Sequence, residues 1–134
     1  MRIRILSLMF VVTLVSASPV PSQESLFSAR VTDRDGNQYL LDSFKRYEYE
    51  FFNCRMRDAH FKLSFEQIGS IDFLEEPDAS LKGYTRANVT LTDGSTSAVY
   101  FSSGSVFVKG TESNFAVELS IPLEELQTIA FVRE

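Results

Sequence analysis

Short stretches of alternating apolar and polar residues recur along the chain, and this period of two is typical of β-strands. Over residues 115–123 an apolar side chain stands at every second position, and residues 59–65 follow the same pattern. Tyr47, Tyr49 and Phe51 form a third alternating run. Because alternate side chains point to opposite faces of a strand, each run predicts one face buried in a core. We therefore expect an all-β fold.

Two Asp-Gly dipeptides mark the turns between predicted strands. Glycine readily adopts the positive φ that a two-residue primed turn requires, so each dipeptide predicts a β-hairpin. This assigns a structural role to four turn residues, Asp35, Gly36, Asp93 and Gly94.

The second half of the chain repeats the first. Residues 29–36 (ARVTDRDG) return as residues 87–94 (ANVTLTDG), and residues 63–73 return as residues 121–131. Both matches hold at one offset of about 58 residues with no gap between them, which indicates an internal repeat. The chain thus predicts two tandem homologous antiparallel β repeats, arranged as small barrels or as one shared sandwich.

Each repeat closes with the same succession of elements. A predicted strand reaches Ser64 or Pro122, residue types that favour the start of a helical turn. Glu66 and Glu124 follow, where a carboxylate complements the positive N-terminal end of such a turn. The pattern predicts a strand, one short helical turn and a short closing strand in each repeat.

The first residues have the pattern of a secretory leader. Arg2 and Arg4 precede an apolar run that is shorter than the ~20 residues needed to span a bilayer, and Val15-x-Ala17 fits a signal-peptidase site. Cleavage after Ala17 predicts a secreted or periplasmic protein without a membrane span. The predicted segments are the signal peptide (1–17), an N-terminal segment (18–28), repeat 1 (29–76), a linker (77–86) and repeat 2 (87–134).

Composition narrows the classes of partner. The chain has 134 residues and a formal net charge of −5, and loss of the two leader arginines makes the mature chain more acidic still. Nucleic acids and anionic membranes bind Lys/Arg patches, so we expect neither as the main partner. Cys54 is the one cysteine, so no internal disulfide can form and the core must hold the fold.

The repeat motifs support a resemblance to a known family. V-T-x-x-D-G near the start of each repeat and I-P-L-x-x-L-x-x-I-x-F near the end of the second resemble the small β-barrel repeats of Sm-like proteins and similar repeats in uncharacterised bacterial envelope proteins. The resemblance implies an architecture and no activity. The Asp-x-x-x-Asn stretch and the Arg-Gly pair with which the Sm family contacts nucleotides have no counterpart here.

The segment from Phe44 to Arg57 differs most between the two halves. It combines aromatic and basic residues, whereas the second half has small polar residues in the matching stretch. Exposed tyrosine and arginine are favoured contact residues in protein interfaces. This segment therefore predicts a binding surface made by Tyr47, Tyr49, Arg55 and Arg57; the alternative is that its aromatic residues only enlarge the core.

Other residues allow an enzymatic or a metal-dependent alternative. Cys54 with His60 could form a thiol nucleophile and its base, and the paired Glu66 and Glu124 could act as general acid and base. The carboxylates of Asp33 and Asp35 resemble half of a calcium loop, without the bidentate glutamate that would complete it. Asn88–Val89–Thr90 fits the N-glycosylation pattern.

From these observations we expect an exported, non-enzymatic binding or assembly module without a metal or cofactor. Its expected partner is another envelope or extracellular protein. A small secreted hydrolase and a structural calcium-binding module are the alternatives.

Overall fold

Antiparallel strands form the fold in the computed structural model, which describes residues 27–74 and 82–133. In both halves a strand leads into a single 3₁₀ turn and then a closing strand, as predicted. The described elements are β1 (Ser28–Asp33), β2 (Gln38–Arg46), β3 (Phe51–Met56), β4 (Ala59–Ser64), η1 (Phe65–Gln67), β5 (Ile68–Phe73), β6 (Tyr84–Leu91), β7 (Thr96–Ser102), β8 (Phe107–Glu112), β9 (Val117–Pro122), η2 (Leu123–Glu125) and β10 (Leu126–Val132).

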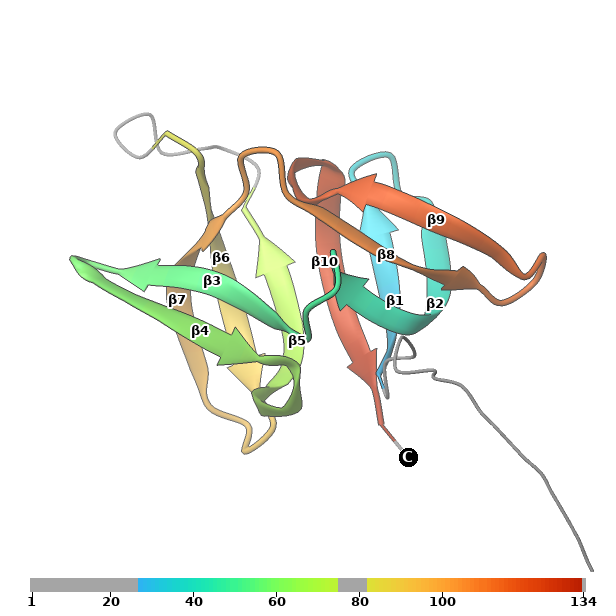
Figure 1. The fold of residues 1–134 in the computed structure, drawn as a ribbon. Coiled ribbons are helices and arrows are strands. Elements are labelled where there is room, and N and C mark those ends of the chain that lie inside the picture. Colours follow the sequence, from blue (N-terminus) through green and yellow to red (C-terminus); the bar gives the residue numbers. More distant parts are fainter. Residues whose placement is uncertain (1–26, 75–81, 134) are drawn as a thin grey trace, which may run out of the picture.

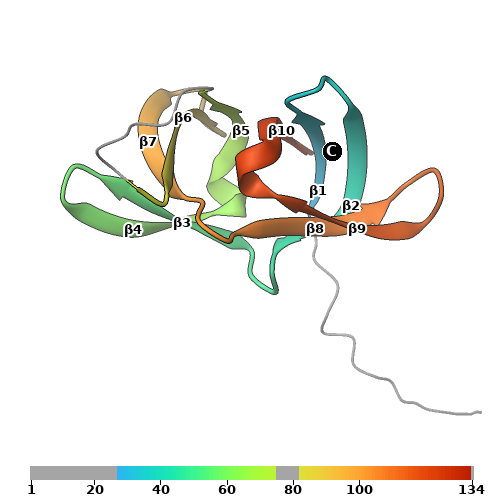
Figure 2. The ribbon, with the colours of Figure 1, turned by 90° about the horizontal axis from the view of Figure 1, so that it is seen from above.

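The described strands belong to one curled antiparallel sheet with the order β4-β3-β7-β6-β5-β10-β1-β2-β8-β9. The sheet curls into two lobes that lie side by side (Figures 1 and 2). One lobe contains β3 to β7, and the other contains β1, β2 and β8 to β10. β5 and β10 pair at the centre and join the two lobes.

Each lobe combines strands from both halves of the sequence. The hairpin β3–β4 pairs with β7 of the second half, and the hairpin β8–β9 pairs with β2 of the first. Replacing every strand by its counterpart in the other half gives the same strand order, read from the opposite edge of the sheet. The predicted all-β class is confirmed. Two tandem repeats are not confirmed, because within the described residues neither half forms a sheet of its own.

The turns at the tips of the β3–β4 and β8–β9 hairpins differ in length. Two residues, Arg57–Asp58, join β3 to β4, whereas four residues join β8 to β9. Met56 pairs with Ala59 beside the first turn, and Glu112 pairs with Val117 beside the second. Met56 and Glu112 are therefore counterparts, and the ungapped sequence alignment fails in this part of the chain.

Both Asp-Gly dipeptides lie in hairpin turns, but these are not the two-residue primed turns that we predicted. Gly36 and Gly94 have φ of 88° and 93°, whereas the aspartates before them are absent from the residues with positive φ. In the first turn Gly36 N–H donates to the Asp33 carbonyl and Asp33 N–H to the Asn37 carbonyl, each at 3.0 Å. This is a three-residue loop with glycine in the bulge position. The Asp33 carboxylate favours the wider loop by accepting the N–H groups of Asp35 and Asn37.

Phenylalanine side chains from both halves form the centre of the core. Phe65 is fully buried at the start of η1. Its ring centroid lies between 4.9 and 5.5 Å from those of four other rings, Phe27, Phe44, Phe52 and Phe131. Packed aromatic rings bury large apolar areas and stabilise one another by edge contacts. The core is thus shared and does not divide into one centre per half.

The alternating pattern over residues 115–123 predicted more burial than the structure has. Leu123 is fully buried, but Phe115 is 78% exposed and Val117 is 47% exposed. β9 is an edge strand, and the β8–β9 hairpin projects beyond its lobe (Figure 2). The described part of the chain therefore leaves the outer end of this predicted core face uncovered.

Backbone and arginine contacts tie each 3₁₀ turn to the rest of the sheet. Ser64 caps η1 by accepting the Glu66 N–H at 3.2 Å, and Gln67 completes a capping box. Arg133, near the C-terminal end, donates to the Phe65 and Ile68 carbonyls around η1. Arg34 makes an equivalent contact with η2, where its Nε donates to the carbonyl of Glu124. These contacts link the two halves a second time.

Two predicted boundaries shift in the structure. β1 begins at Ser28, and Phe27 packs in the core, so the end of the predicted N-terminal segment belongs to the fold. β6 begins at Tyr84, inside the predicted linker. The predicted signal peptide lies outside the described residues. Within residues 27–74 and 82–133, no helix has the length and apolar character needed to cross a membrane.

Candidate functional site

The β2–β3 connector protrudes at the centre of one face, where the chain passes from one lobe to the other (Figures 1 and 2). Arg46 and Tyr49 exchange two backbone hydrogen bonds of 2.9 Å each and close a tight turn. Tyr47 lies in this turn with a φ of 57°. Surrounding contacts must hold a non-glycine residue in that conformation. The turn presents Tyr47 and Tyr49 outward, 39% and 50% exposed.

Arg46 supports this turn from beneath. The residue is only 6% exposed, and its Nε donates to the Phe51 carbonyl at 2.8 Å. The guanidinium carbon lies 5.0 Å from the Tyr49 ring centroid and 4.9 Å from that of Phe51. Burial lowers the pKa of Arg46, but an arginine remains charged at neutral pH. The cation therefore stabilises the rings above it by cation–π attraction.

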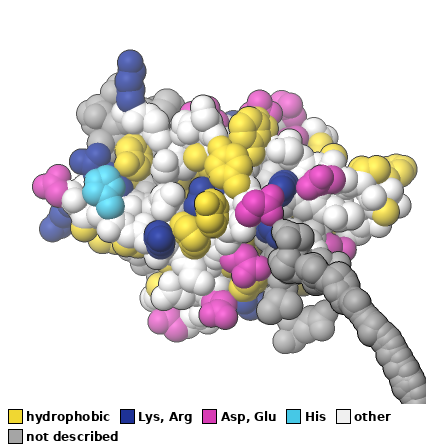
Figure 3. Space-filling view, viewed as in Figure 1, with side chains coloured by type: hydrophobic (Ala, Val, Ile, Leu, Met, Phe, Trp, Pro, Cys, Tyr) yellow, Lys and Arg dark blue, Asp and Glu magenta, His cyan; other side chains and the backbone are white. Residues whose placement is uncertain are grey.

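Four aromatic side chains, which we call the aromatic face, gather around this turn: Tyr47, Tyr49, Phe51 and Phe107. The Tyr47 hydroxyl donates to the carbonyl of Ser105, and its ring centroid lies 6.4 Å from that of Phe107. Tyr49 and Phe51 are 5.2 Å apart by the same measure. Figure 3 shows hydrophobic side chains gathered at the centre of this side of the molecule. Both halves of the chain contribute to the aromatic face.

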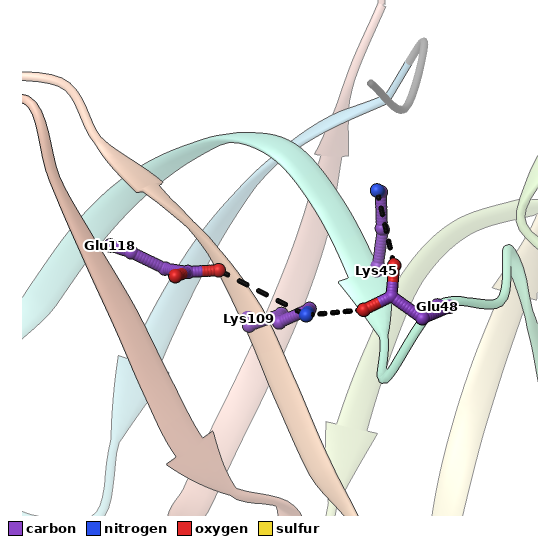
Figure 4. A network of polar contacts seen from close by, with 4 residues as sticks. All are labelled: Lys45, Glu48, Lys109 and Glu118. Carbon is purple, nitrogen blue, oxygen red and sulfur yellow. Dashed lines mark hydrogen bonds and ion pairs between the residues drawn. The ribbon is translucent and has the colours of Figure 1, made fainter. Parts of the chain in front are cut away.

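Charged residues border the aromatic face. Glu48, in the same turn, accepts from Lys109 Nζ at 2.6 Å and lies 3.6 Å from Lys45 Nζ (Figure 4). Lys109 also approaches Glu118 at 4.0 Å. The hydrogen bond from Lys109 lowers the pKa of Glu48, and the same contact raises the pKa of Lys109. These four residues line a shallow polar groove of about 380 Å³ and fix the connector to β8 and β9.

The four residues that the sequence predicted for binding do not form one cluster. Tyr47 and Tyr49 lie together in the connector. Arg55 lies within β3, where its guanidinium is 5.7 Å from the Tyr84 ring centroid and 3.7 Å from an Asp58 carboxylate oxygen. Arg57 is in the turn at the far end of β3, with a φ of 56°. The structure joins the two tyrosines and leaves Arg57 at a separate place.

Several residues of this face were not among those predicted. Arg46 lies in the same divergent segment as the tyrosines, so the sequence could have indicated it as a residue of this site. Lys62 lies 4.9 Å from the Phe51 ring centroid but comes from β4. Phe107 comes from β8 in the other half of the chain. Only strand pairing brings these last two residues to the connector.

Cys54 and His60 do not face each other as a nucleophile and its base. Cys54 pairs with Phe61 and His60 with Arg55 across the β3–β4 hairpin, so their side chains leave opposite faces. Both residues border a groove of about 390 Å³, but Cys54 is 2% exposed and its thiol lies 3.8 Å from the Phe52 carbonyl. Burial raises the pKa of this thiol to about 12. The reactive thiolate is therefore disfavoured.

The predicted carboxylate sites have local structural roles. Glu66 and Glu124 are exposed in the first turns of η1 and η2, as the helix-start interpretation expects. Asp33 accepts three hydrogen bonds inside its own turn, from Asp35 and Asn37. Burial acts to raise the pKa of Asp33, but the hydrogen bonds from Asn37 and Asp35 outweigh it and the pKa is lowered. No cluster of three or more metal-ligating side chains occurs within the described ranges.

The turn that contains Asp93 and Gly94 is stabilised by different contacts from the turn that contains Asp35 and Gly36. Asp93 accepts from the backbone N–H and the hydroxyl of Ser95, and the hydroxyl contact is the main cause of its lowered pKa. Asn88, the glycosylation candidate, is exposed in the middle of β6 and pairs with Asp72 and Ala98 on either side.

A protein-family model described as "Uncharacterised protein" matches residues 23–134. The chain belongs to this family. The match covers both halves, so it spans the whole interleaved sheet, including every residue of the aromatic face. It carries no Sm-like assignment, and the resemblance to Sm-like repeats gains no support from it. A comparison with curated proteins finds no match.

Proposed function

We propose that the chain is an exported, non-enzymatic binding or assembly module that contacts another envelope or extracellular protein through the aromatic face. The observation that carries this proposal is the pair of exposed tyrosines held on a buried arginine. Rings this exposed add little to the core, yet a strained turn and two cation–π contacts from Arg46 hold them outward. Rings fixed in advance lose little conformational entropy when a partner covers them.

The surroundings of the aromatic face also support a protein partner. Interface centres are rich in tyrosine, phenylalanine and arginine, with a polar rim around them. Here the rim comprises Glu48, Lys109 and Glu118 on one side and Lys62 on the other. The mixed signs of these charges favour a polar protein surface over a uniformly charged polymer.

The internal repeat supports the assembly aspect of the proposal. The unchanged strand order on exchange of the halves supports descent of the sheet from a duplicated β unit. In a duplicated fold the two connectors start equal, and only the first has become aromatic: Tyr47 lies beside Ser105, which occupies the matching position of the second connector. A change confined to one copy is expected where one copy acquires a contact.

Site-specific photocrosslinking tests the proposal. A benzophenone amino acid is placed at position 49 of the full chain, and the chain is expressed in the cells that naturally make it. The matched control carries the same group at Ser95, an exposed residue of the β6–β7 turn. We expect one discrete adduct from position 49 and none of that mass from position 95. An adduct of twice the subunit mass identifies a second copy as the partner and supports assembly.

A substitution then measures the contribution of the face to the complex. Tyr49→Ser removes a ring that is half exposed and outside the core, so folding should be preserved. We expect binding of the crosslinked partner to weaken about tenfold, as for a central interface residue, while Ser95→Ala leaves it unchanged. Equal crosslinking at positions 49 and 95, or undiminished binding by a folded Tyr49→Ser protein, contradicts the proposal.

A further inference from the structure

The β3–β4 hairpin leaves part of its neighbouring strand uncovered. β3 pairs with β7 only at Cys54↔Phe101 and Arg55↔Tyr100, and then diverges from it. The edge of β7 from Thr96 to Val99 therefore has no strand partner on this side within the described residues. Backbone groups along such an edge form a template for an added strand.

The other lobe shows the same edge in a closed form. There β8 continues along β2 as far as Leu41↔Glu112, and Ser113 N–H then donates to the Leu40 carbonyl at 3.2 Å. Leu40 is the counterpart of Ala98 on β7, and Ser113 is the counterpart of Arg57. Within the described residues Arg57 donates no such bond to Ala98, so the uncovered edge is longer in β7 (residues 96–99) than in β2 (residues 38–39).

A groove of about 780 Å³ follows the open edge. Met56 and Phe61 line it from the hairpin, and Ala98 lines it from β7, which gives it an apolar floor. Met56 is 42% exposed, although it lies on the same face of β3 as the buried Phe52 and Cys54. The groove thus combines a free strand edge with a partly uncovered apolar surface.

The described charged residues at this groove have one sign. Arg57 and Arg86 line it, and no carboxylate is among the described residues that line it. Neither arginine takes part in an ion pair within residues 27–74 and 82–133. In a chain with a net charge of −5, two arginines that pair with no described carboxylate mark a local preference for anionic groups.

We propose that this groove binds an extended acidic peptide segment of a partner protein, which adds a strand to the open edge of β7. Main-chain hydrogen bonds to residues 96–99 supply the register. Alternate apolar side chains of the peptide contact Met56 and Phe61, and its carboxylates pair with Arg57 and Arg86. The site lies at the tip of the β3–β4 hairpin, is separate from the aromatic face and does not depend on the function proposed for that face.

A binding titration with a defined probe tests this inference. The probe is a short fluorescein-labelled peptide of alternating glutamate and valine, titrated with the mature chain and followed by fluorescence anisotropy. We expect saturable binding that Arg86→Glu and Arg57→Glu each weaken about tenfold, since charge reversal replaces attraction by repulsion. Arg30→Glu is the matched control, because Arg30 is also exposed on a strand but lies in the other lobe. It should leave binding within about twofold.

Two further peptides separate strand addition from simple charge attraction. A peptide with lysine in place of glutamate should not bind. A glutamate–valine peptide methylated at alternate backbone nitrogens should bind at least about tenfold more weakly, because it cannot complete the main-chain ladder. Equal binding of the methylated peptide overturns strand addition. Absence of saturable binding, or equal weakening by Arg30→Glu, overturns the groove as an acidic-peptide site. Tyr49→Ser should leave this titration unchanged, so failure here and failure at the aromatic face are distinguishable.

Discussion

At the residue scale, left-handed backbone conformations occur at residues of both proposed sites. Tyr47, Arg57 and Ser105 all have positive φ without being glycine. Tyr47 is at the centre of the aromatic face, and Arg57 lines the proposed peptide groove. Strained positions of this kind are retained where the surroundings hold them. Both sites therefore depend on local backbone conformation as well as on side-chain type.

Glycine at the two hairpin turns is required by backbone conformation alone. A Cβ at Gly36 or Gly94 would meet nothing within 4 Å, yet φ is 88° and 93°. Gly36→Val and Gly94→Val should each lower the free energy of unfolding by about 1–2 kcal/mol, because a β-branched residue is strained there.

Urea unfolding followed by circular dichroism measures this change. Gly104→Ala is the control, because its φ is not positive and a methyl group there would find its nearest atom, the Gly83 Cα, at 3.5 Å, an ordinary contact. If the valine variants unfold at the urea concentration of the native sequence, the role of glycine in these turns is wrong.

Cys54 should behave as an inert thiol. Burial raises its pKa to about 12, so little thiolate forms at pH 8 and alkylation by iodoacetamide should be slow until urea unfolds the chain. Rapid alkylation of the folded protein at pH 8, with a rate that does not rise on unfolding, contradicts this prediction.

The same pKa shift has a consequence for stability. A folded-state pKa above the unfolded value gives a contribution that is complete below about pH 9 and is lost as pH rises toward 12. The difference in unfolding free energy between the native chain and Cys54→Ala should therefore shrink over that interval. Other groups titrate there too, but they are common to both proteins and cancel in the difference.

At the scale of elements, the exchanged hairpins explain why matching positions of the two halves carry different residues. Gly110 in β8 is the counterpart of Cys54 in β3. A Cβ at Gly110 would lie 2.8 Å from Leu41 Cβ and 2.9 Å from the Asp42 carbonyl oxygen. β8 lies close against β2 there, at a register shift between the two strands, whereas Cys54 pairs with Phe101 of β7 and its side chain is buried. The same position of the repeat therefore excludes a side chain in one lobe and buries one in the other.

Gly110→Ala should consequently destabilise the protein by about 1–3 kcal/mol, the usual effect of overpacking. Thermal unfolding measures the change, with Gly104→Ala again as the control. Because the close neighbours are backbone and a β-carbon, no side-chain rotation can relieve the contact. An unchanged melting temperature for Gly110→Ala contradicts the tight β2–β8 packing.

At the scale of the whole molecule, interleaving makes the two halves interdependent. The β3–β4 hairpin of the first half pairs with β7 of the second, and the β8–β9 hairpin of the second half pairs with β2 of the first. The ring centroids of Phe65 and Phe131, one from each half, lie 4.9 Å apart. In a single half, the strands that pair across the halves, such as β2 with β8 and β3 with β7, have no partner. A single half also lacks the core residues that the other half supplies. Stability is therefore a property of the complete sheet.

Separate halves should not fold. Residues 18–78 and residues 79–134, made as two polypeptides, should each lack a cooperative thermal transition, because each lacks the strands that complete its lobe. An equimolar mixture should regain the antiparallel circular dichroism spectrum and a single transition. A cooperative transition in either isolated half contradicts the interleaved fold.

The sequence by itself determined the elements of this protein. Alternation located β4 and β9, the repeated ending located η1 and η2, and the Asp-Gly dipeptides located two hairpin turns, because all of these depend on residues adjacent in the chain. The third alternating run was wrong as a buried strand face, because Tyr47 and Tyr49 lie in a turn and are exposed. The sequence also singled out the divergent segment that contains Arg46, Tyr47 and Tyr49, since composition alone distinguishes that segment from its counterpart.

Only the tertiary structure decided which strands pair. Strands of both halves have the same alternating pattern, so sequence allows a hairpin to pair within its own half or with the other. The exchange brings Phe107 to the aromatic face and leaves β7 open beside Arg57 and Arg86. Phe115 is exposed in the turn between β8 and β9, although its periodicity is that of a core residue. Burial depends on which neighbours cover a strand, and those neighbours come from distant parts of the chain.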